Sequence, residues 1–288
     1  MYRFRPLREK DKPILYAIIN KYRDVPLKWR SMYVVSNYSA GVHVISCYNK
    51  VVGMVHITKT SSNEGWLESA YIMPSHRGRG VGSAFAKYQI SQAKMMSIKT
   101  LRVATGHKNS RVQHLMIDKF GFSKPNLWHR LKLTTKNPNN TVPSVIKIRP
   151  DKVYECWSYI KNHHDNNSAG GLITSPQDNC WWTGLDPKVL SDILNSEQSL
   201  AYVSEKKIKG LLLVKKTRAM NFNSLTVLQS FTSSNIALEQ MIRKLLTTNN
   251  TVFLSVSKDP LPVVNKLKKE ASVKKISLNK WVVMEKQL

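Results

Sequence analysis

The sequence has no hydrophobic run near the roughly 20 apolar residues that cross a bilayer. Stretches such as Leu211–Val214 have the length of a strand. The opening residues, Met1–Pro6, lack the apolar segment of an export signal, so we expect a cytoplasmic protein, with the nucleus as the alternative. Cysteine is also scarce: Cys47, Cys156 and Cys180 are odd in number and far apart, which argues against a disulfide framework or a zinc knuckle.

Acidic residues are few, since 18 Asp and Glu stand against 45 Lys and Arg, and the formal net charge is +27. This charge favours an anionic partner such as nucleic acid, an acidic polypeptide or a phosphate-bearing cofactor. The basic residues are scattered, however, and match no zinc-finger, homeodomain or RNA-recognition signature. Nucleic acid stays open as a partner but is not favoured. With 42% hydrophobic residues, the chain can bury a core.

The order of expected elements occurs twice along the 288 residues. An Arg-Pro pair precedes an amphipathic helix in each half, a strand–turn–strand unit follows, and each half closes with strand, helix and strand. In the first half these segments are 10–22, 42–48, 51–59, 100–105, 109–120 and 127–133; in the second they are 152–161, 200–204, 208–216, 251–257, 262–270 and 274–285.

A polar, proline-punctuated stretch separates the two halves. We therefore expect two α/β domains of similar topology, covering residues 1–134 and 144–288, with a linker at 135–143. A single domain with accidental pattern echoes is the alternative.

One segment carries a recognisable chemistry. The strand Trp66–Met73 leads into a turn with Gly78, Gly80 and Gly82, and a helix follows over Ser83–Met96. Unpaired amides converge at the start of a helix, and its dipole makes that end positive. Glycines without a Cβ let a phosphate approach the backbone.

The basic residues of this turn add charge where a diphosphate would lie, because Arg77 and Arg79 flank Gly78. The glycine spacing does not fit the dinucleotide-binding G-x-G-x-x-G pattern or a Walker loop. A tight turn without a ligand is the other interpretation of the glycines.

The pattern R-x-x-G-x-G, formed by Arg77, Gly80 and Gly82 after a strand and before a helix, resembles motif A of the GNAT superfamily of acetyl-CoA-dependent N-acetyltransferases. The resemblance continues through a strand at Thr100–Thr105 and a helix that ends at Lys119–Phe122. It implies a mixed, mostly antiparallel sheet with flanking helices, and a tandem of two such domains. The segment Glu68–Gly82 is most similar to the histidine N-acetyltransferase-like branch.

This resemblance implies acetyl-CoA as co-substrate, no metal, and transfer of the acetyl group to a small amine, such as the free amino acid histidine. A protein lysine or N-terminus is the first alternative acceptor. A non-catalytic, basic nucleic-acid-binding protein on the same fold is the second. The residues that it places on the cofactor are Tyr71, Ile72, Met73, Arg77, Gly78, Arg79, Gly80, Val81, Gly82, Ser83 and Ser110.

Acetyl transfer needs a neutral amine, so a base must take a proton from it. Glu68 is the candidate, since strand alternation places it with Ala70 and Ile72 on one face, where partial desolvation would raise its proton affinity. A surface glutamate paired with a lysine is the alternative. For the general acid, counting back from the Gly-Phe pair puts Ser110 at the family's asparagine site and Ile117 at its tyrosine site, and isoleucine cannot donate a proton. Either Tyr71 or His114 serves instead, or water protonates the thiolate.

The second half lacks a glycine- and arginine-containing turn of this kind. Between its corresponding strand and helix lies Phe231–Asn235, which contains neither arginine nor glycine. We therefore expect a degenerate domain without a CoA loop. Two other features of this half have structural interpretations. We expect the run Cys180–Trp182 to form part of the core or a wall of the acceptor pocket. We expect His163–Asp165 to lie in a loop rather than to bind a metal.

Overall fold

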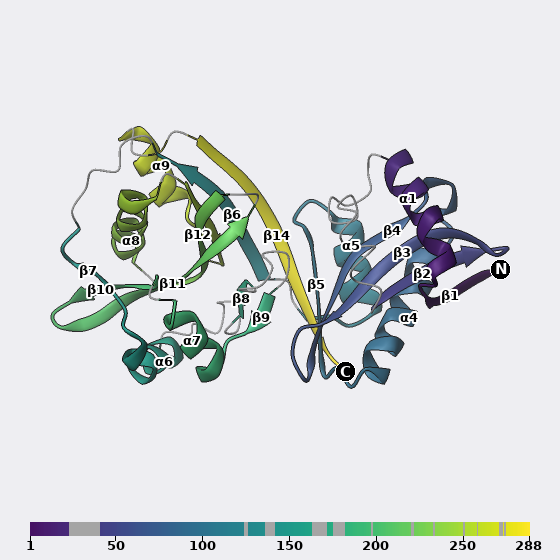
Figure 1. Ribbon diagram of the computed structural model, residues 1–288, viewed down its shortest axis with the longest axis horizontal. Coiled ribbons are helices and arrows are strands. Elements are labelled where there is room, and N and C mark those ends of the chain that lie inside the picture. Colours follow the sequence, from purple (N-terminus) through teal and green to yellow (C-terminus); the bar gives the residue numbers. More distant parts are fainter. Residues whose placement is uncertain are drawn as a thin grey trace. The chain divides into compact units, whose positions relative to one another are not determined.

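A helix or strand forms at each segment that the periodicity predicted, as the computed structural model shows (Figure 1). The structure describes residues 1–22, 41–123, 126–135, 142–162, 172–174, 182–196, 198–219, 222–232, 234–249, 251–257, 259–270, 273 and 275–288. Most of the predicted linker lies outside these ranges.

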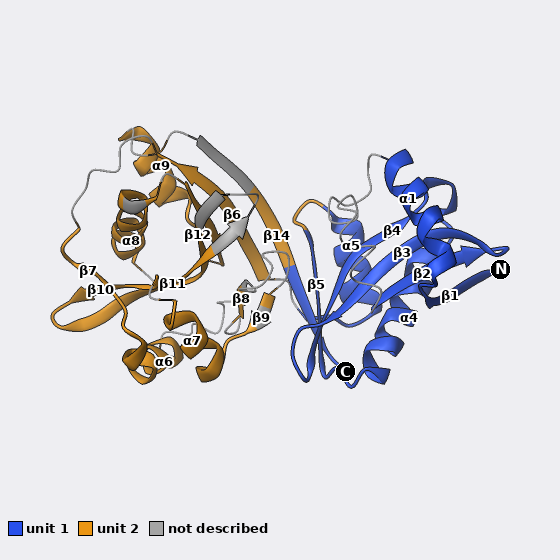
Figure 2. Cartoon of the chain, in the orientation of Figure 1, with its two compact units in different colours: residues 1–105, 109–125, 283–288 blue, residues 106–108, 126–282 orange. Residues whose placement is uncertain are grey.

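The chain divides into two units (Figure 2). Unit 1 comprises residues 1–105, 109–125 and 283–288, and unit 2 comprises residues 106–108 and 126–282. We describe each unit by itself.

Unit 1 is a mixed sheet with helices on both faces. Its strands lie in the order β1 (Tyr2–Pro6), β2 (Val42–Cys47), β3 (Lys50–Lys59), β4 (Glu64–Ile72), β5 (Thr100–Gly106) and the end of β14 (Lys275–Gln287). The first four strands are antiparallel, and β4 and β5 are parallel. Its helices are α1 (Lys12–Lys21), α4 (Val81–Met95) and α5 (Ser110–His114), followed by a π-helical turn at Leu115–Lys119.

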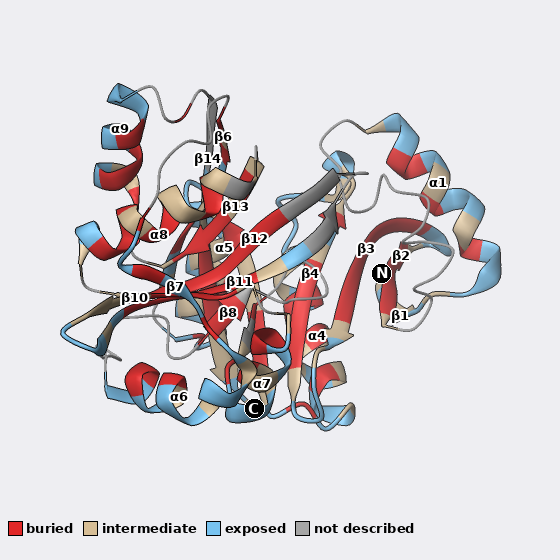
Figure 3. Cartoon of the chain, turned by 60° about the vertical axis from the view of Figure 1, so that its left-hand side comes forward, coloured by how far each residue is buried: buried red, intermediate tan, exposed pale blue. Residues whose placement is uncertain are grey.

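The two long helices of unit 1 cover opposite faces of its sheet. Leu15, Ile18 and Ile19, at helical spacing on α1, pack against Val44 and other residues of β2 and β3. On the other face, Phe85 of α4 packs with Ile45, Val52 and Val55. The inward faces of the helices are buried and the outward faces exposed (Figure 3).

The corner between β1 and α1 is fixed by an ion pair between a partly buried arginine and a buried carboxylate. Both nitrogens of the Arg5 guanidinium donate to the carboxylate of Asp11, at 2.6 and 2.8 Å. Asp11 is 3% exposed, and this hydrogen bond from Arg5 holds its pKa below the usual range. The bidentate pair thereby sets the angle at which the helix leaves the strand.

The last residues of the chain complete the sheet of unit 1. Residues 275–282 of β14 lie in unit 2 beside β6, and residues 283–287 lie in unit 1 beside β5. Glu285 binds the buried Arg102 of β5 at 2.9 Å, and Arg102 also pairs with Glu64 at 2.9 Å. A buried arginine without a partner would destabilise the fold, so the stability of unit 1 depends on Glu285 from the end of the chain.

Unit 2 has a second mixed sheet. Its strand order is β14, β6 (Asn126–Thr134), β13 (Thr251–Val256), β12 (Phe222–Phe231), β11 (Lys207–Ala219), β10 (Leu200–Ser204) and β7 (Val145–Lys147), with a separate pair β8 (Leu172–Thr174) and β9 (Trp182–Gly184). On one face lie α6 (Val153–Asn162) and α7 (Pro187–Leu194); on the other lie α8 (Asn235–Thr248) and α9 (Leu261–Lys269). The sequence did not predict α7 or the β8–β9 pair.

Two irregularities recur at corresponding places in both units. The β2–β3 and β10–β11 hairpins turn through two residues of positive φ, Tyr48–Asn49 and Glu205–Lys206, as a type I′ turn requires. The next strand pair of each unit then contains a register shift, and the pair after that is parallel. The two sheets therefore share local geometry as well as strand order.

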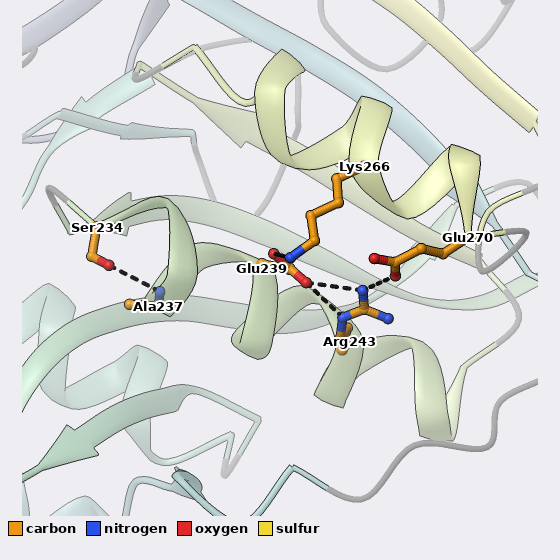
Figure 4. A network of polar contacts seen from close by, with 6 residues as sticks. All are labelled: Ser234, Ala237, Glu239, Arg243, Lys266 and Glu270. Atoms are coloured by element: carbon orange, nitrogen blue, oxygen red, sulfur yellow. Dashed lines mark hydrogen bonds and ion pairs between the residues drawn. The ribbon is translucent and has the colours of Figure 1, made fainter.

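Helices α8 and α9 are joined by a charged network (Figure 4). Glu239 of α8 is 7% exposed, accepts from Arg243 at 3.0 Å and from Lys266 of α9 at 2.9 Å. Arg243 also pairs with Glu270. Burial alone would raise the pKa of Glu239, but the hydrogen bonds from Lys266 and Arg243 outweigh it, and the pKa lies below its ordinary value.

We expect Glu239→Gln to destabilise the protein by about 1–3 kcal/mol at pH 7, because a buried, charge-assisted network loses its negative charge and one of its two accepting oxygens. A carboxyl with a lowered folded pKa stabilises the fold above its unfolded pKa, and that contribution disappears as the pH falls through the folded value. The gap between wild type and variant should therefore narrow as the pH falls below the ordinary glutamate pKa of about 4.3. Urea unfolding at pH 7 and pH 3.5 measures it; a gap that is equal at both values would contradict the assignment.

Candidate functional site

The strand that leads to the glycine turn is irregular at its middle. Ser69 has a positive φ of 57°, and the pairing of β3 with β4 shifts register there: His56 lies opposite Glu68, whereas Met54 lies opposite Tyr71. A bulge of this kind inserts extra residues into one strand and reverses the side-chain alternation beyond it. Glu68 and Tyr71 therefore share one face of the sheet.

The predicted alternation of β4 is thus wrong. Glu68 does not share a face with Ile72: Tyr71 packs with the residues under α1, and Ile72 packs with those under α4. The bulge at Ser69 is the physical reason, since simple alternation counts one side chain per residue. Of the two predicted catalytic residues, the structure brings Glu68 and Tyr71 to the same side.

Glu68 is a buried carboxylate with two polar neighbours from β3. It is 9% exposed, and its Oε1 lies 2.7 Å from His56 Nδ1 and accepts a hydrogen bond of 2.7 Å from the Thr58 hydroxyl. His56 is 2% exposed. Glu68 is therefore not a surface residue, as the alternative interpretation assumed. A desolvated carboxylate held by two donors has the chemistry of a general base.

Strands β4 and β5 separate beside this carboxylate. Their parallel pairing ends at Leu67 opposite Val103, and β4 continues without it. The amide of Met73 donates to the carbonyl of Val52 on β3 at 2.9 Å. Neighbouring amides of a strand point to opposite sides, so the N–H and C=O of Ile72 point to the side where β5 has diverged.

The glycine turn follows directly. Gly78 and Gly80 have φ of 76° and 74°, a backbone that other residues adopt only with strain, and a Cβ on either would meet nothing within 4 Å. Gly82 has no positive φ, and a Cβ there would lie 3.7 Å from Ile72. The open space above the first two glycines can admit a group as wide as a phosphate, so these residues fit a diphosphate.

Helix α4 presents its first amides at this turn. Gly80 is its N-cap residue and offers no capping side chain, the first turn holds no acidic residue, and the amide of Ala84 bonds to the carbonyl of Gly80. The N–H groups of Val81, Gly82 and Ser83 are therefore the donors at the positive end of the helix. The side chain of Val81 is buried, so that it can contribute only its amide.

The two arginines of the turn differ in placement. Arg77 Nε donates to the carbonyl of Ile72 at 2.7 Å, and the guanidinium lies 5.3 Å from the ring centre of Tyr71. It is thus folded back onto the end of β4, on the side where β5 has diverged. Both arginines are exposed, as are Gly78 and Gly80.

The predicted contact Ser110 is exposed at the start of α5, and Asn109 caps this helix. The Asn109 side chain accepts from the amide of Val112 and donates to Thr105 at 2.9 Å. The helix continues through the π-helical turn at Leu115–Lys119, which takes up one extra residue. Counting back from the Gly-Phe pair at the helix end therefore stops at Ser110, one residue short of Asn109. Of the groups named as substitute acids, His114 is exposed and pairs with Asp118.

The corresponding place in unit 2 is closed by the protein itself. The Ser234 hydroxyl caps α8 by accepting from the amide of Ala237 at 3.2 Å (Figure 4). Beyond the last parallel pair of β12 and β13, the Gln229 side chain donates to the Ser257 hydroxyl at 3.2 Å and accepts from the Ser257 amide at 3.4 Å. Gln229 thus bridges the two strands where they would otherwise separate.

The remaining features of unit 2 are described only in part. Trp182 is buried in T-shaped contact with Trp128. Cys180, Trp181 and His163–Asp165 lie outside the described residues. Within the described part of the chain, no three His, Cys, Asp or Glu residues gather as metal ligands would. Nor does any helix there have the length and apolar composition to cross a membrane.

Comparisons with known proteins agree with this geometry. Residues 4–122 match the acetyltransferase (GNAT) family. A GCN5-related N-acetyltransferase from Sphaerobacter thermophilus is 12% identical with a TM-score of 0.59, over 99% of this chain and 95% of that chain. Another from Anabaena variabilis is 13% identical with a TM-score of 0.51, over 98% and 72%. Among curated protein sequences, none matches.

The family match covers β1 through the Gly-Phe pair after α5, which includes Glu68, the glycine turn and the start of α4. The structural likeness extends the shared fold over nearly the whole chain. GNAT proteins use acetyl-CoA, and the open glycine turn fits its diphosphate. Residues 4–122 therefore match the GNAT acetyltransferase family, and this match together with the shared fold indicates that the chain is an N-acetyltransferase.

Proposed function

We propose that this enzyme acetylates the amine of a small molecule, in particular a free amino acid such as histidine. The observation that carries the proposal is the buried carboxylate of Glu68, 9% exposed, on the strand that leads into the glycine turn. A base at that depth suits a small acceptor that the protein can enclose. The similarity of Glu68–Gly82 to the histidine-type branch supports the same acceptor class.

In this proposal the glycine turn holds the diphosphate of acetyl-CoA. The amides of Val81, Gly82 and Ser83 point at it from the start of α4, the glycines Gly78 and Gly80 leave room for it, and Arg79 adds charge. Bound there, acetyl-CoA supplies an activated thioester. Ser110 stays a proposed contact, and Asn109, which caps the same helix, joins it as one that the sequence count missed.

Glu68 acts on the acceptor. At neutral pH an α-amine is largely protonated, since its pKa is about 8. The carboxylate of Glu68 takes one proton from this ammonium, and the nitrogen lone pair becomes available to form the new C–N bond. Burial among β3 and β4 residues keeps bulk water from competing for the same carboxylate.

Two further groups orient the reacting carbonyl and the leaving sulfur. The amide of Ile72 points to the side where β5 has diverged, which makes it the best donor of the set Tyr71, Ile72 and Met73; the amide of Met73 is already bonded to Val52. Tyr71 is the proposed acid, because its ring is buried on the face of Glu68. It would donate its hydroxyl proton to the sulfur as the C–S bond breaks, and the second proton that the acceptor nitrogen loses would restore the hydroxyl.

The second half of the chain is proposed to be a degenerate GNAT-like domain, with the sequence boundaries 1–134 and 144–288; the described units differ from these boundaries, because β6 belongs to unit 2 and residues 283–288 belong to unit 1. The type I′ turns, register shifts and parallel pairs that recur in both units support this. In this proposal unit 2 has no cofactor site. The Ser234 side chain caps the start of α8, and Gln229 bridges the strands where they would separate, whereas α4 of unit 1 begins at Gly80, which offers no capping side chain.

The net charge of +27 favours a second candidate, a lysine or N-terminus of an acidic polypeptide. One experiment separates the acceptors. The protein is incubated with acetyl-CoA and either free amino acids, including histidine, or acidic peptides, and thiol release and product mass are followed. Release with free amino acids alone supports the proposal. Release with peptides alone would replace it, and salt-sensitive nucleic-acid binding without CoA binding would favour the non-catalytic alternative.

A further inference from the structure

A buried hydrogen-bonded trio surrounds the proposed base. His56 Nδ1 and the Thr58 hydroxyl both lie 2.7 Å from Glu68 Oε1, and the hydroxyl lies 3.2 Å from His56 Nδ1. An ionised carboxylate can only accept hydrogen bonds, so Nδ1 of His56 must carry a proton. The hydroxyl has a single proton, which it gives to Glu68. The tautomer of His56 and the orientation of the carboxylate are therefore fixed together.

We propose that His56 is the positioning residue of Glu68, with Thr58 as its second support; this inference rests on the proposed function. Two donors on one oxygen hold the carboxylate in a single rotamer and stabilise its charged form, the form that accepts a proton. A buried carboxylate without them would be protonated more readily or would rotate away. His56 thus acts on the acceptor only through Glu68.

The sheet supplies a matched comparison. His43 on β2 is 6% exposed, and the ring faces Tyr88 of α4 at 5.5 Å, while its Nδ1 lies 3.1 Å from the carbonyl of Gly41. In the strand pairing His43 lies opposite Val55, and His56 lies opposite Val42, so the two rings lie on opposite faces. Burial lowers the pKa of His43. A buried histidine that makes no contact with Glu68 therefore exists one strand away.

The test compares four variants. His56→Leu removes the donor, His56→Asn keeps an N–H near Nδ1, Thr58→Val removes the second donor at similar shape, and His43→Leu controls for loss of a buried imidazole. We expect His56→Leu to lower kcat by about 10–100-fold, as loss of an orienting neighbour does. The KM for the amine and the Kd for CoA by calorimetry should change less than about 3-fold. His56→Asn should recover most of kcat, and Thr58→Val should lose about 3–10-fold.

A readout without turnover accompanies these rates. In ¹⁵N spectra of the histidine-labelled protein, Nδ1 of His56 should appear protonated and should shift in Glu68→Gln, whereas His43, which senses His56 only through space, should shift much less. Unchanged kcat in His56→Leu, or an Asn variant as slow as Leu, would overturn the inference while the acetyltransferase assignment stands. If His56→Leu does not fold, the Asn and Thr58→Val rates and the spectrum decide. A wild type that binds CoA but acetylates no amine would overturn the proposed function instead.

Discussion

Glu68→Gln should lower kcat by about 10²–10⁴-fold, the usual contribution of a general base. The amide keeps the shape of the side chain, and its oxygen can still accept from Thr58 and His56 in place of Oε1. It cannot accept a proton from an ammonium. Folding and the Kd for CoA should therefore stay near their wild-type values, because the glycine turn is untouched. Steady-state thiol release and calorimetry with CoA measure the two quantities.

Glu64→Gln on the same strand is the control. Glu64 pairs with Arg102 rather than with His56, so this variant should lose stability but keep kcat. The rate of Glu68→Gln should also recover partly at high pH, where more of the amine is neutral without a base. A Glu68→Gln enzyme with wild-type kcat at neutral pH would show that the proton goes elsewhere, and Glu68 would then be a structural partner of His56.

The elements that sequence periodicity predicted are those whose pattern is local. Leu15, Ile18 and Ile19 recur at helical spacing, and α1 places all three in the core. The glycine turn was visible for the same reason, because three glycines and two arginines after a strand lie within a few residues. In both cases the residues that form the feature are neighbours in the sequence, so a local pattern reveals it.

The parts that the sequence did not predict depend on distant contacts or on a single irregular residue. Ser69 adopts a positive φ without being glycine, and the resulting bulge places Glu68 and Ile72 on opposite faces of the sheet. The π-helical turn displaces Asn109 by one position from the count. Glu285 reaches Arg102 across 183 residues of sequence, a pairing that no local pattern encodes. The partner of Glu68, His56, comes from another strand, and only the register of β3 and β4 reveals it.

Gly80→Ala should weaken CoA binding by about 100-fold or more. The methyl group would project into the space above the turn, where nothing lies within 4 Å, and that space is the proposed diphosphate position. Loss of two charge-assisted hydrogen bonds there, at roughly 1.5 kcal/mol each, corresponds to that factor. The φ of 74° adds strain of about 1–2 kcal/mol for any residue with a Cβ, and this lowers stability as well.

Strain alone can be separated from the loss of the binding site, because the chain offers a second glycine of similar conformation. Gly121 has a φ of 64°, and a Cβ there would meet Lys286 at 3.4 Å, away from the turn. Gly121→Ala should therefore cost a comparable amount of stability in urea unfolding while CoA binds with nearly its wild-type Kd. Equal loss of CoA affinity in both variants would mean that strain propagates through the fold. Unchanged affinity in Gly80→Ala would mean that the diphosphate lies elsewhere, since a methyl group and a phosphate cannot share the same space.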